Sequence, residues 1–369
     1  MTTAVLAAVA RDAGGAFNLE QLVLDDPEDD EVLVRIAGVG LCHTDLAARD
    51  QVIPIPLPAV FGHEGAGTVE RVGRNVLDLA PGDSVILSFM SCGLCPPCAD
   101  GQPAYCGHFV PLNFGGGRTG DGTALHNGEE AISSHFFSQS SFANYALANR
   151  RNVVKASSDL PLALLGPLGC GIQTGAGAIL HSLDCKAGQT VAIFGAGPVG
   201  ISAVMAAAAR GCSTIIVIEP VAARRKMALG LGATDALDPA AGDVLSAIRS
   251  ICPGGIDASL DVTGIPAVIE TAIASLRKRG TCALIGVPEV AGQTFSVRTG
   301  LMVQNGTTLV GVMEGDSDPQ VFIPQLLEMQ AAGDFPFERM ITTYSFADIN
   351  RAVADQKAGF VLKAVLIPD

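Results

Sequence analysis

Apolar residues follow two different patterns along the chain. Up to about residue 155, short apolar runs such as 31–36 and 84–87 lie between turns rich in glycine and proline. This texture is typical of a β-rich, irregular region. From about residue 188, fully apolar runs alternate with helical segments, and these runs cover residues 190–194, 214–218, 256–260, 281–285 and 307–312. Continuous apolar strands separated by helices predict a parallel sheet covered on both faces.

The helices expected between these strands span 199–210, 222–231, 243–251 and 267–276, and a short strand is expected near 234–237. A helix over 319–332 and an apolar run at 361–367 end the chain. Residues 109–142 contain many glycine, serine and asparagine residues and show little periodicity, so we expect a long surface loop there. The whole pattern predicts an α/β protein with a second, β-rich part.

Composition and charge narrow the classes of partner. The 369 residues are 49% hydrophobic and 16% charged, which excludes a disordered chain. The formal net charge is −14, from 23 basic and 37 acidic residues, so nucleic acid is not an expected partner. Two uncharged stretches, 160–183 and 189–209, exceed the ~18 residues of a membrane span. Proline and glycine interrupt both, so we expect a soluble, cytoplasmic protein with no membrane partner.

A glycine-rich turn follows the apolar run 190–194 directly and opens the next predicted helix. It reads Gly195-Ala196-Gly197-Pro198-Val199-Gly200. The first glycine allows a tight turn, the second lets the backbone approach a pyrophosphate, and the third lets helix pack on strand. The helix N-terminus offers unpaired N–H groups to the phosphates. In this context the motif predicts a dinucleotide site.

The next predicted strand ends in Glu219, where a carboxylate can accept hydrogen bonds from both hydroxyls of the adenosine ribose. A carboxylate would also repel a 2′-phosphate, so we expect NAD rather than NADP. The alternative is that Glu219 is simply a solvated strand end. Arg224 can reach the same ribose, or it can be an ordinary surface arginine, and it leaves NADP open.

Ten cysteines occur in a chain without a signal-like N-terminus, which favours reduced thiols or metal ligands over disulfides. Four of them lie close together in the sequence with C-x2-C-x2-C spacing followed by a fourth: Cys92, Cys95, Cys98 and Cys106. Four thiolates can enclose one tetrahedral Zn²⁺ and leave no open position, so this set predicts a structural zinc site.

A catalytic metal needs a second set of ligands with an open position. Three further candidates lie in glycine-rich contexts: Cys42-His43, Gly62-His63-Glu64 and Gly169-Cys170-Gly171. None is specific alone, because a single histidine is more often structural than a metal ligand.

These residues together carry a resemblance to a known family. The pattern Gly62-His63-Glu64-x-x-Gly67-x5-Gly73-x-x-Val76, the cysteine quartet and the later glycine motif resemble the zinc-dependent medium-chain alcohol dehydrogenases over essentially the whole chain. The segments CHTDLAARD and SHFFSQSSFANYAL look most similar to the bacterial aryl (benzyl-type) and allylic alcohol dehydrogenases.

The family's fold follows from this resemblance. It implies a doubly wound Rossmann domain that binds NAD over residues 172–314. It also implies a β-rich, GroES-like catalytic domain with a structural zinc lobe, formed by 1–171 and 315–369. Relatives are homodimers or homotetramers, so a homo-oligomer is expected.

The resemblance also assigns roles to the second set of ligands. Cys42, His63 and Cys170 would bind the catalytic zinc, giving two zinc ions per chain. Glu64 matches a residue behind the metal that can act as an alternate ligand. Asp45 matches the carboxylate that orients the ligand histidine, a role with clear physical sense.

Further matches concern proton transfer and cofactor phosphates. Thr44 matches the hydroxyl residue that carries the alcohol's proton toward the cofactor ribose, but Ala47 stands where many relatives complete the relay with histidine. His43 stands where relatives often have an arginine at the pyrophosphate, and Lys363 matches another basic contact there. Because histidine is only partly charged near pH 7, we expect a weaker, pH-sensitive grip on the cofactor.

The substrate pocket is the least specific part of the resemblance. Phe89, Met90 and Phe142 are candidates for an apolar lining, although all three can equally be core residues. The remaining cysteines are expected to be small buried hydrophobes, and they are Cys185, Cys212, Cys252 and Cys282. Loop or surface positions are expected for the remaining histidines, namely His108, His126, His135 and His181.

The expected activity is interconversion of a primary alcohol, aromatic or allylic/terpenoid by preference, and its aldehyde by hydride transfer to NAD. Alternatives within enzymes are an S-(hydroxymethyl)glutathione dehydrogenase, which a basic pocket would favour, and an aldehyde reductase. A non-catalytic nucleotide-binding or structural protein would be expected to lack catalytic zinc ligands, as would a zinc-free quinone reductase. All three candidate ligands are present.

Overall fold

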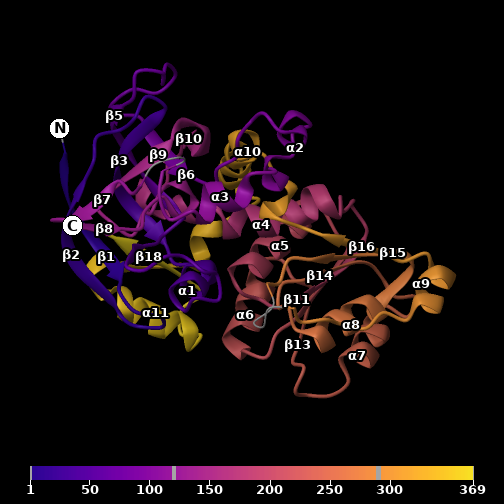
Figure 1. Cartoon of the computed structure of the whole chain (residues 1–369). Coiled ribbons are helices and arrows are strands. Elements are labelled where there is room, and N and C mark those ends of the chain that lie inside the picture. Colours follow the sequence, from indigo (N-terminus) through magenta and orange to yellow (C-terminus); the bar gives the residue numbers. More distant parts are fainter. Residues whose placement is uncertain (1, 119–121, 288–291, 369) are drawn as a thin grey trace. The chain divides into compact units, whose positions relative to one another are not determined.

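The computed structural model describes residues 2–118, 122–287 and 292–368, and the chain divides into two compact units (Figure 1). Unit 1 extends from the N-terminal segment to Cys170 and also contains Asp318–Ala331 and the segment from Glu338 onward. Unit 2 contains Gly171–Ser317 and Ala332–Phe337. Unit 1 is therefore built from segments at both ends of the chain.

Two sheets form the framework of unit 1 (Figure 1). The first has the strand order β4 (Ala59–Val60), β1 (Thr3–Ala10), β2 (Phe17–Leu24), β7 (Leu125–Asn127), β8 (Glu130–Ile132). The second has the order β10 (Val153–Lys155), β6 (Ser84–Leu87), β5 (Gly65–Val72), β3 (Glu31–Gly40), β18 (Lys363–Ile367), β17 (Ile341–Ser345), with β9 (Tyr145–Asn149) also paired to β3. The long strand β3 thus joins strands from three distant parts of the chain.

The helices of unit 1 are short and connect or cover these strands. They are α1 (His43–Arg49), α2 (Pro96–Ala99), α3 (Phe109–Phe114), α10 (Pro319–Ala331) and α11 (Ile349–Lys357). Single 3-10 turns add to them at Pro103–Tyr105, Phe136–Ser138, Arg150–Asn152, Leu162–Leu164, Gly166–Gly169, Phe337–Met340 and Phe346–Asp348.

The expectation of a surface loop over 109–142 was wrong. The described part of this segment contains α3, the β7–β8 hairpin and a 3-10 turn. Its phenylalanines 109, 136, 137 and 142 are buried. The periodicity was hidden because each element is only one turn or three residues long, and aromatic burial replaces regular secondary structure as the source of stability.

Unit 2 is a six-stranded sheet in which all pairs are parallel. Its order is β13 (Asp235–Leu237), β12 (Thr214–Ile218), β11 (Thr190–Phe194), β14 (Ile256–Asp261), β15 (Leu276–Leu284), β16 (Thr308–Gly311). The connecting helices are α5 (Pro198–Ala209), α6 (Ala222–Gly230), α7 (Val244–Ile251), α8 (Pro266–Ser275) and α9 (Thr299–Asn305). Before the sheet come α4 (Gly171–Gly177) and a π-helical turn at Ala178–Ser182, and after it comes a 3-10 turn at Glu314–Asp316.

The strand order explains why helices cover both faces. The chain steps outward from β11 to β13, returns to β14, and then steps outward again to β16. Because parallel crossovers are right-handed, reversing the direction of travel puts the later helices on the opposite face. Figure 1 shows α5 on one side of the sheet and α7 and α8 on the other. The predicted doubly wound parallel sheet is confirmed.

The core of unit 2 takes up the apolar strand with which the uncharged stretch 189–209 begins. The buried apolar residues of β11, β12 and the helices pack together, among them Ala192, Phe194, Ile216, Ile218, Ile248 and Ala272. No single helix in the described residues is long and apolar enough to cross a membrane. The consecutive short helices Leu162–Gly169 and Gly171–Ser182 meet that test, by length and composition, only when they are taken together.

Candidate active site

Strands β3 and β5 bring the first candidate metal ligands together. β3 ends just before Cys42, and β5 begins just after Glu64. In the antiparallel ladder Val39 pairs with Gly65, so the segments beyond these two strand ends are neighbours. The 3-10 turn Gly166–Gly169 delivers the fourth side chain. One ligand atom from each of four residues lies within 4.8 Å of the others, and these residues are Cys42, His63, Glu64 and Cys170.

Asp45 fixes the imidazole of His63. Asp45 Oδ1 lies 2.8 Å from His63 Nδ1, and both side chains are fully buried. Asp45 is the third residue of α1, and its Oδ2 accepts the N–H of Cys42, the helix N-cap, at 2.9 Å. Its Oδ1 also accepts the N–H of Gly62 at 3.0 Å. The start of α1 therefore holds the carboxylate, and the carboxylate holds the histidine.

The glycine before the histidine is required by the backbone. Gly62 has φ +88, and a Cβ there would meet the backbone nitrogen of Phe142 at 2.4 Å. An L-residue would be strained in this conformation and would also clash. The sequence Gly62-His63 thus serves to turn the imidazole into the cluster.

The four side chains suit a metal ion. His63 Nε2 is buried, and Nδ1 of the same ring is held by Asp45. Hydrogen bonding from Cys170 and His63 lowers the pKa of the Cys42 thiol well below its ordinary value. An open imidazole nitrogen beside an acidic thiol and a second cysteine is a donor set that zinc prefers. Second-sphere carboxylates such as Asp45 commonly orient a zinc-bound histidine.

Glu64 and Lys363 form a buried ion pair beside this cluster. Burial raises the pKa of Glu64 to about 7, although the Lys363 ammonium acts in the opposite direction. Lys363 is 1% exposed and donates to the backbone oxygen of Leu41 at 3.0 Å. The lysine expected at the cofactor phosphates therefore has its ammonium directed at Glu64 and Leu41 in this structure.

The other two residues of the CHT segment lie at the edge of the cluster. Thr44 Oγ1 is 3.8 Å from Cys42 Sγ, and its side chain is partly exposed. His43, the first residue of α1, is exposed. Ala47 lies one turn further along the helix and is 8% exposed. The hydroxyl of Thr44 is thus a partly exposed polar group within 3.8 Å of a candidate ligand sulfur.

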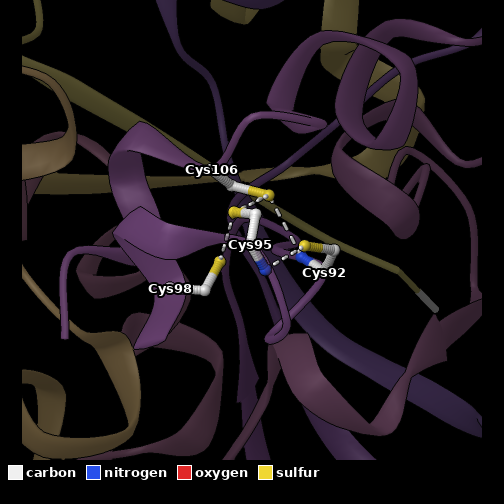
Figure 2. A group of neighbouring side chains, drawn as sticks. All are labelled: Cys92, Cys95, Cys98 and Cys106. Atoms are coloured by element: carbon white, nitrogen blue, oxygen red, sulfur yellow. Dashed lines mark hydrogen bonds between the residues drawn. The ribbon is translucent and has the colours of Figure 1, made fainter. Parts of the chain in front are cut away.

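The cysteine quartet converges in a separate lobe of unit 1 (Figure 2). Cys95 Sγ lies 3.5 Å from Cys98 Sγ and 3.8 Å from Cys106 Sγ. Four sulfurs around one zinc at bonds of about 2.3 Å would be separated by about 3.8 Å. Backbone N–H groups of Leu94 and Cys95 point at Cys92 and lower the pKa of its thiol to about 5. The lobe therefore fits a closed, four-thiolate zinc site.

Arg151 is a residue of this lobe that sequence reasoning missed. Its guanidinium donates to the backbone oxygen of Ser91 at 2.9 Å and to Ser91 Oγ at 3.3 Å. A Cβ at Gly93, which has φ +73, would come within 2.4 Å of the same guanidinium. Gln320 of α10 in turn donates to the backbone oxygen of Arg151 at 3.0 Å. The arginine thus pins the loop between the first two cysteines.

Aromatic rings surround the imidazole of His63. Phe137 stacks on it at a centroid distance of 4.4 Å, and Phe136 meets it edge-on at 5.4 Å. Phe114 and Phe109 pack against Phe137 at 5.1 and 6.2 Å. None of these four phenylalanines was named as a site residue from the sequence, although Phe136 and Phe137 belong to the segment SHFFSQSSFANYAL that carries the resemblance.

The three residues expected to line a substrate pocket lie in different places. Phe89 joins the aromatic cluster through Phe109, at 5.8 Å. The backbone of Met90 is held by Asn113, whose Oδ1 accepts its N–H at 2.8 Å. Phe142 is fully buried and packs edge-on against Phe17 at 5.6 Å. Only Phe89 of the three is connected to the rings around His63 by the described ring contacts.

The glycine-rich turn of unit 2 has the geometry that its sequence predicts. Gly195 has φ +99, and a Cβ at Gly200 would meet the backbone oxygen of Gly195 at 2.0 Å. A Cβ at Gly197 would meet nothing within 4 Å, so this glycine faces open space at the start of α5. Pro198 occupies the first turn of that helix, where no N–H is needed. Val199 follows it and packs its backbone oxygen beside α4.

Glu219 sits at the end of β12, next to this turn. Its Oε2 accepts the N–H of Ala196 at 2.7 Å, and its Oε1 accepts the N–H of Val221 at 2.9 Å. Arg224 Nε is buried and has no hydrogen-bond partner in the described residues. Its neighbour Arg225, which the sequence did not single out, donates to the backbone oxygen of Glu219 at 2.7 Å. A fixed carboxylate and a partner-free guanidinium nitrogen thus lie at the edge of the turn.

Two of the minor expectations can be compared with the structure. Cys185, Cys252 and Cys282 are buried as expected, and Cys212 is half-buried. His135 lies in a loop position, which agrees with one of the two expectations, but its imidazole is buried against Glu31 and is not on the surface. A carboxylate 104 positions away in the sequence gives no local signal of that contact.

Comparison with known proteins agrees with this geometry. Residues 28–158 match the alcohol dehydrogenase GroES-like domain, and residues 198–331 match the zinc-binding dehydrogenase domain. Geraniol dehydrogenase of Castellaniella defragrans is 50% identical over 363 residues, which are 98% of this chain and 97% of that protein.

Two solved structures are similar over their whole length. A chain described as an alcohol dehydrogenase zinc-binding domain protein from Burkholderia ambifaria is 50% identical, with a TM-score of 0.97 and coverage of 100% and 99%. Benzyl alcohol dehydrogenase from Acinetobacter calcoaceticus is 41% identical, with a TM-score of 0.96 and full coverage of both chains. Given the two metal-ligand clusters and the dinucleotide turn, the chain belongs to the zinc-dependent medium-chain alcohol dehydrogenases.

Proposed function

We propose that this enzyme oxidises primary alcohols whose carbinol carbon is attached to an aromatic ring or an allylic double bond, with NAD as hydride acceptor. The observation that carries the proposal is the group of phenylalanine rings packed on His63, led by Phe137 at 4.4 Å. A flat, π-rich substrate is the natural partner of such a surface. The similar geraniol and benzyl alcohol dehydrogenases bear names of alcohols in these two classes.

The residues in and beside the cluster that contains Cys42 and His63 are proposed to have distinct roles. Cys42, His63 and Cys170 would hold the catalytic zinc, which supplies a Lewis acid that makes a bound alcohol hydroxyl acidic. Asp45 keeps His63 Nδ1 engaged, so that Nε2 remains the donor atom. Lys363 balances the charge of Glu64 beside the ligands.

Thr44 is proposed to receive the alcohol's proton. Its hydroxyl lies next to Cys42 and is partly exposed, so it can accept a proton on one side and pass one to water or to the cofactor ribose on the other. Ala47 has no group that can take up or release a proton, so the last step to solvent needs water or another group.

The cofactor is proposed to be NAD, with its pyrophosphate at Gly195, Gly197 and the N-terminus of α5. Glu219 is fixed by the N–H groups of Ala196 and Val221 and keeps free lone pairs for ribose hydroxyls. Its negative charge opposes a 2′-phosphate. Arg224 and His43 are proposed to contact the ribose and the phosphates respectively.

We further propose that the enzyme is a homodimer or homotetramer. Strand β16 is the last strand in the order of its sheet, and an edge strand is a position at which a strand of a second copy can pair. Leu301 and Val303 of the preceding helix are 41% and 84% exposed. An edge strand with exposed apolar neighbours favours association with a second copy.

The activity test is NADH formation at 340 nm with zinc-loaded enzyme and a panel of alcohols. Benzyl, cinnamyl and geranyl alcohols should be oxidised with a higher kcat/KM than ethanol, S-(hydroxymethyl)glutathione should be poor, and NADP should be the weaker acceptor. Cys170→Ser should abolish turnover and remove one of two zinc ions, whereas Cys212→Ser should change neither. Preference for S-(hydroxymethyl)glutathione, or for NADP, would refute the corresponding assignment.

A further inference from the structure

The segment that carries the two phenylalanines next to His63 has an unusual backbone. Four of its residues adopt a left-handed conformation without being glycine: His135 at φ +59, and Phe137, Ser138 and Ser140 at φ +51. Each such residue is disfavoured relative to a right-handed one, because its Cβ comes too close to the following carbonyl oxygen. Contacts from outside the segment must therefore hold it in place.

The middle and end of the segment are tied by side-chain amides and a hydroxyl. Gln139 Nε2 donates to the backbone oxygen of His63 at 2.9 Å. Asn152 Nδ2 donates to the backbone oxygens of Phe137 and Ser138 at 3.1 and 3.3 Å. Ser140 Oγ donates to the backbone oxygen of Val60 at 2.6 Å. These bonds fix the part of the segment after Phe136.

The start of the segment is held by a different kind of contact. His135 Nε2 lies 3.0 Å from Glu31 Oε1, and Nδ1 lies 2.8 Å from Ser134 Oγ. Glu31 also accepts Arg118 Nη2 at 2.8 Å, and both Glu31 and His135 are buried. Burial would raise the pKa of Glu31, but the hydrogen bonds from His135 and Arg118 outweigh it and lower this pKa to about 2. The imidazole is thus anchored to a permanent, buried anion on β3.

We infer that His135 is a positioning residue: its bond to Glu31 holds the strained segment so that Phe136 and Phe137 stay packed on His63 and form the wall against which the alcohol binds. This inference rests on the proposed function. His135 acts through the two rings, because its own described bonds are to Glu31 and Ser134. Glu31 lies on β3 and Cys42 lies just beyond the end of the same strand, so β3 positions both the phenylalanine segment and a metal ligand.

Loss of the bond between His135 and Glu31 should weaken the binding of large, flat substrates more than that of small ones. Without the bond between His135 and Glu31, the left-handed residues can relax, and the rings of Phe136 and Phe137 can occupy a wider range of positions. An aromatic alcohol then loses contact with the wall, while a small alcohol that never fills the space is little affected. We expect an effect on KM rather than on kcat, because the metal ligands and Asp45 keep their own bonds.

The test compares His135→Asn and Glu31→Gln with His126→Gln as matched control. Asparagine tolerates a positive φ but is too short to span to Glu31. His126 also pairs with a carboxylate, Asp25 at 3.4 Å, but on the exposed side of the same network. For His135→Asn, losing one hydrogen bond to a charged group should raise KM for benzyl alcohol about tenfold. Its kcat, and KM for ethanol, should stay within about twofold, and His126→Gln should match the wild type.

Hydrogen exchange followed by mass spectrometry supplies a readout that needs no catalysis. Amides of 134–141 should exchange at least about tenfold faster in His135→Asn and Glu31→Gln, while those of β11 and β12 remain unchanged. Unchanged exchange in 134–141, or a loss of activity equal for benzyl alcohol and ethanol, would overturn the inference. If the wild type oxidises no alcohol, the proposed function fails, and the exchange result still decides whether His135 anchors the segment.

Discussion

Replacing Asp45 by asparagine tests how the fold holds its catalytic metal ligands. The change keeps the shape of the side chain but removes its charge and turns one oxygen into an NH2 group. In the wild type the carboxylate accepts three N–H donors, from Cys42, Gly62 and His63. Asparagine has one oxygen, so it can face Gly62 and His63 only if its NH2 faces the Cys42 N–H.

The magnitude follows from this count. One of three charge-assisted bonds is lost, and two N–H groups are left facing each other across a distance that was 2.9 Å. A hydrogen bond to a charged group is worth about 1.5–3 kcal/mol. Loss of such a partner typically weakens metal binding by about 10- to 100-fold, which is about 1.4–2.7 kcal/mol. We therefore expect zinc release from the catalytic cluster to accelerate by about one to two orders of magnitude.

The assay is transfer of zinc to a chromogenic chelator, followed over time. Two phases are expected, one for each cluster, and the slow phase of the four-cysteine lobe serves as an internal reference. Asp50→Asn is the matched control, because Asp50 follows the same helix and pairs with Arg49 outside the cluster. If Asp45→Asn released both zinc ions at the wild-type rates, the role assigned to Asp45 would be refuted.

Three further substitutions test other parts of the structure. The pKa of Glu31 is lowered from its ordinary value of 4.5 to about 2, so the ionised carboxylate stabilises the folded protein above pH 4.5, and this stabilisation is lost as the pH falls toward about 2. Glu31→Gln should therefore remove of the order of 3 kcal/mol from the change in the free energy of unfolding over this pH range. Chemical unfolding at a series of pH values measures this change, and parallel curves of stability against pH for the two proteins would contradict the prediction. His43→Arg should tighten NADH binding and slow its release in fluorescence titration and stopped flow, and an unchanged NADH affinity would argue against a phosphate contact. Ala47→His should raise the rate of alcohol oxidation near neutral pH by restoring a proton carrier; an unaltered pH–rate profile would count against the relay.

Local sequence patterns were sufficient to predict the features whose residues are close together in the sequence. The glycine motif predicted its own turn, because Gly195 needs a positive φ and Gly200 needs close packing. The cysteine quartet predicted its cluster. Its first three cysteines have two residues between neighbours and lie around the start of the short helix α2, and this spacing lets their side chains reach one ion. The parallel sheet was predictable from apolar runs such as β11 and β12, since a strand buried on both faces reads as a nearly continuous apolar run.

Other predictions depended on the resemblance, because the groups involved are far apart in the chain. Nothing local shows that Cys170 meets Cys42 and His63. The register of β3 against β5 brings Cys42 near His63, and the close packing of the turn Gly166–Gly169 on Glu64 brings Cys170 to them; both are tertiary properties. For the same reason the approach of Lys363 to Glu64 is visible only when β18 is placed next to β3.

By itself the sequence determined the kinds of chemistry available to this protein: a four-cysteine zinc site, a dinucleotide turn and an α/β sheet. Tertiary structure alone decided which rings surround His63, that His135 is buried on Glu31, and that Phe109, Phe136, Phe137 and Phe142 are buried. The physical reason is that turns and ligand spacings are fixed by bonded geometry over a few residues. Aromatic packing and buried ion pairs have no preferred sequence separation, so only the folded chain can bring their partners together.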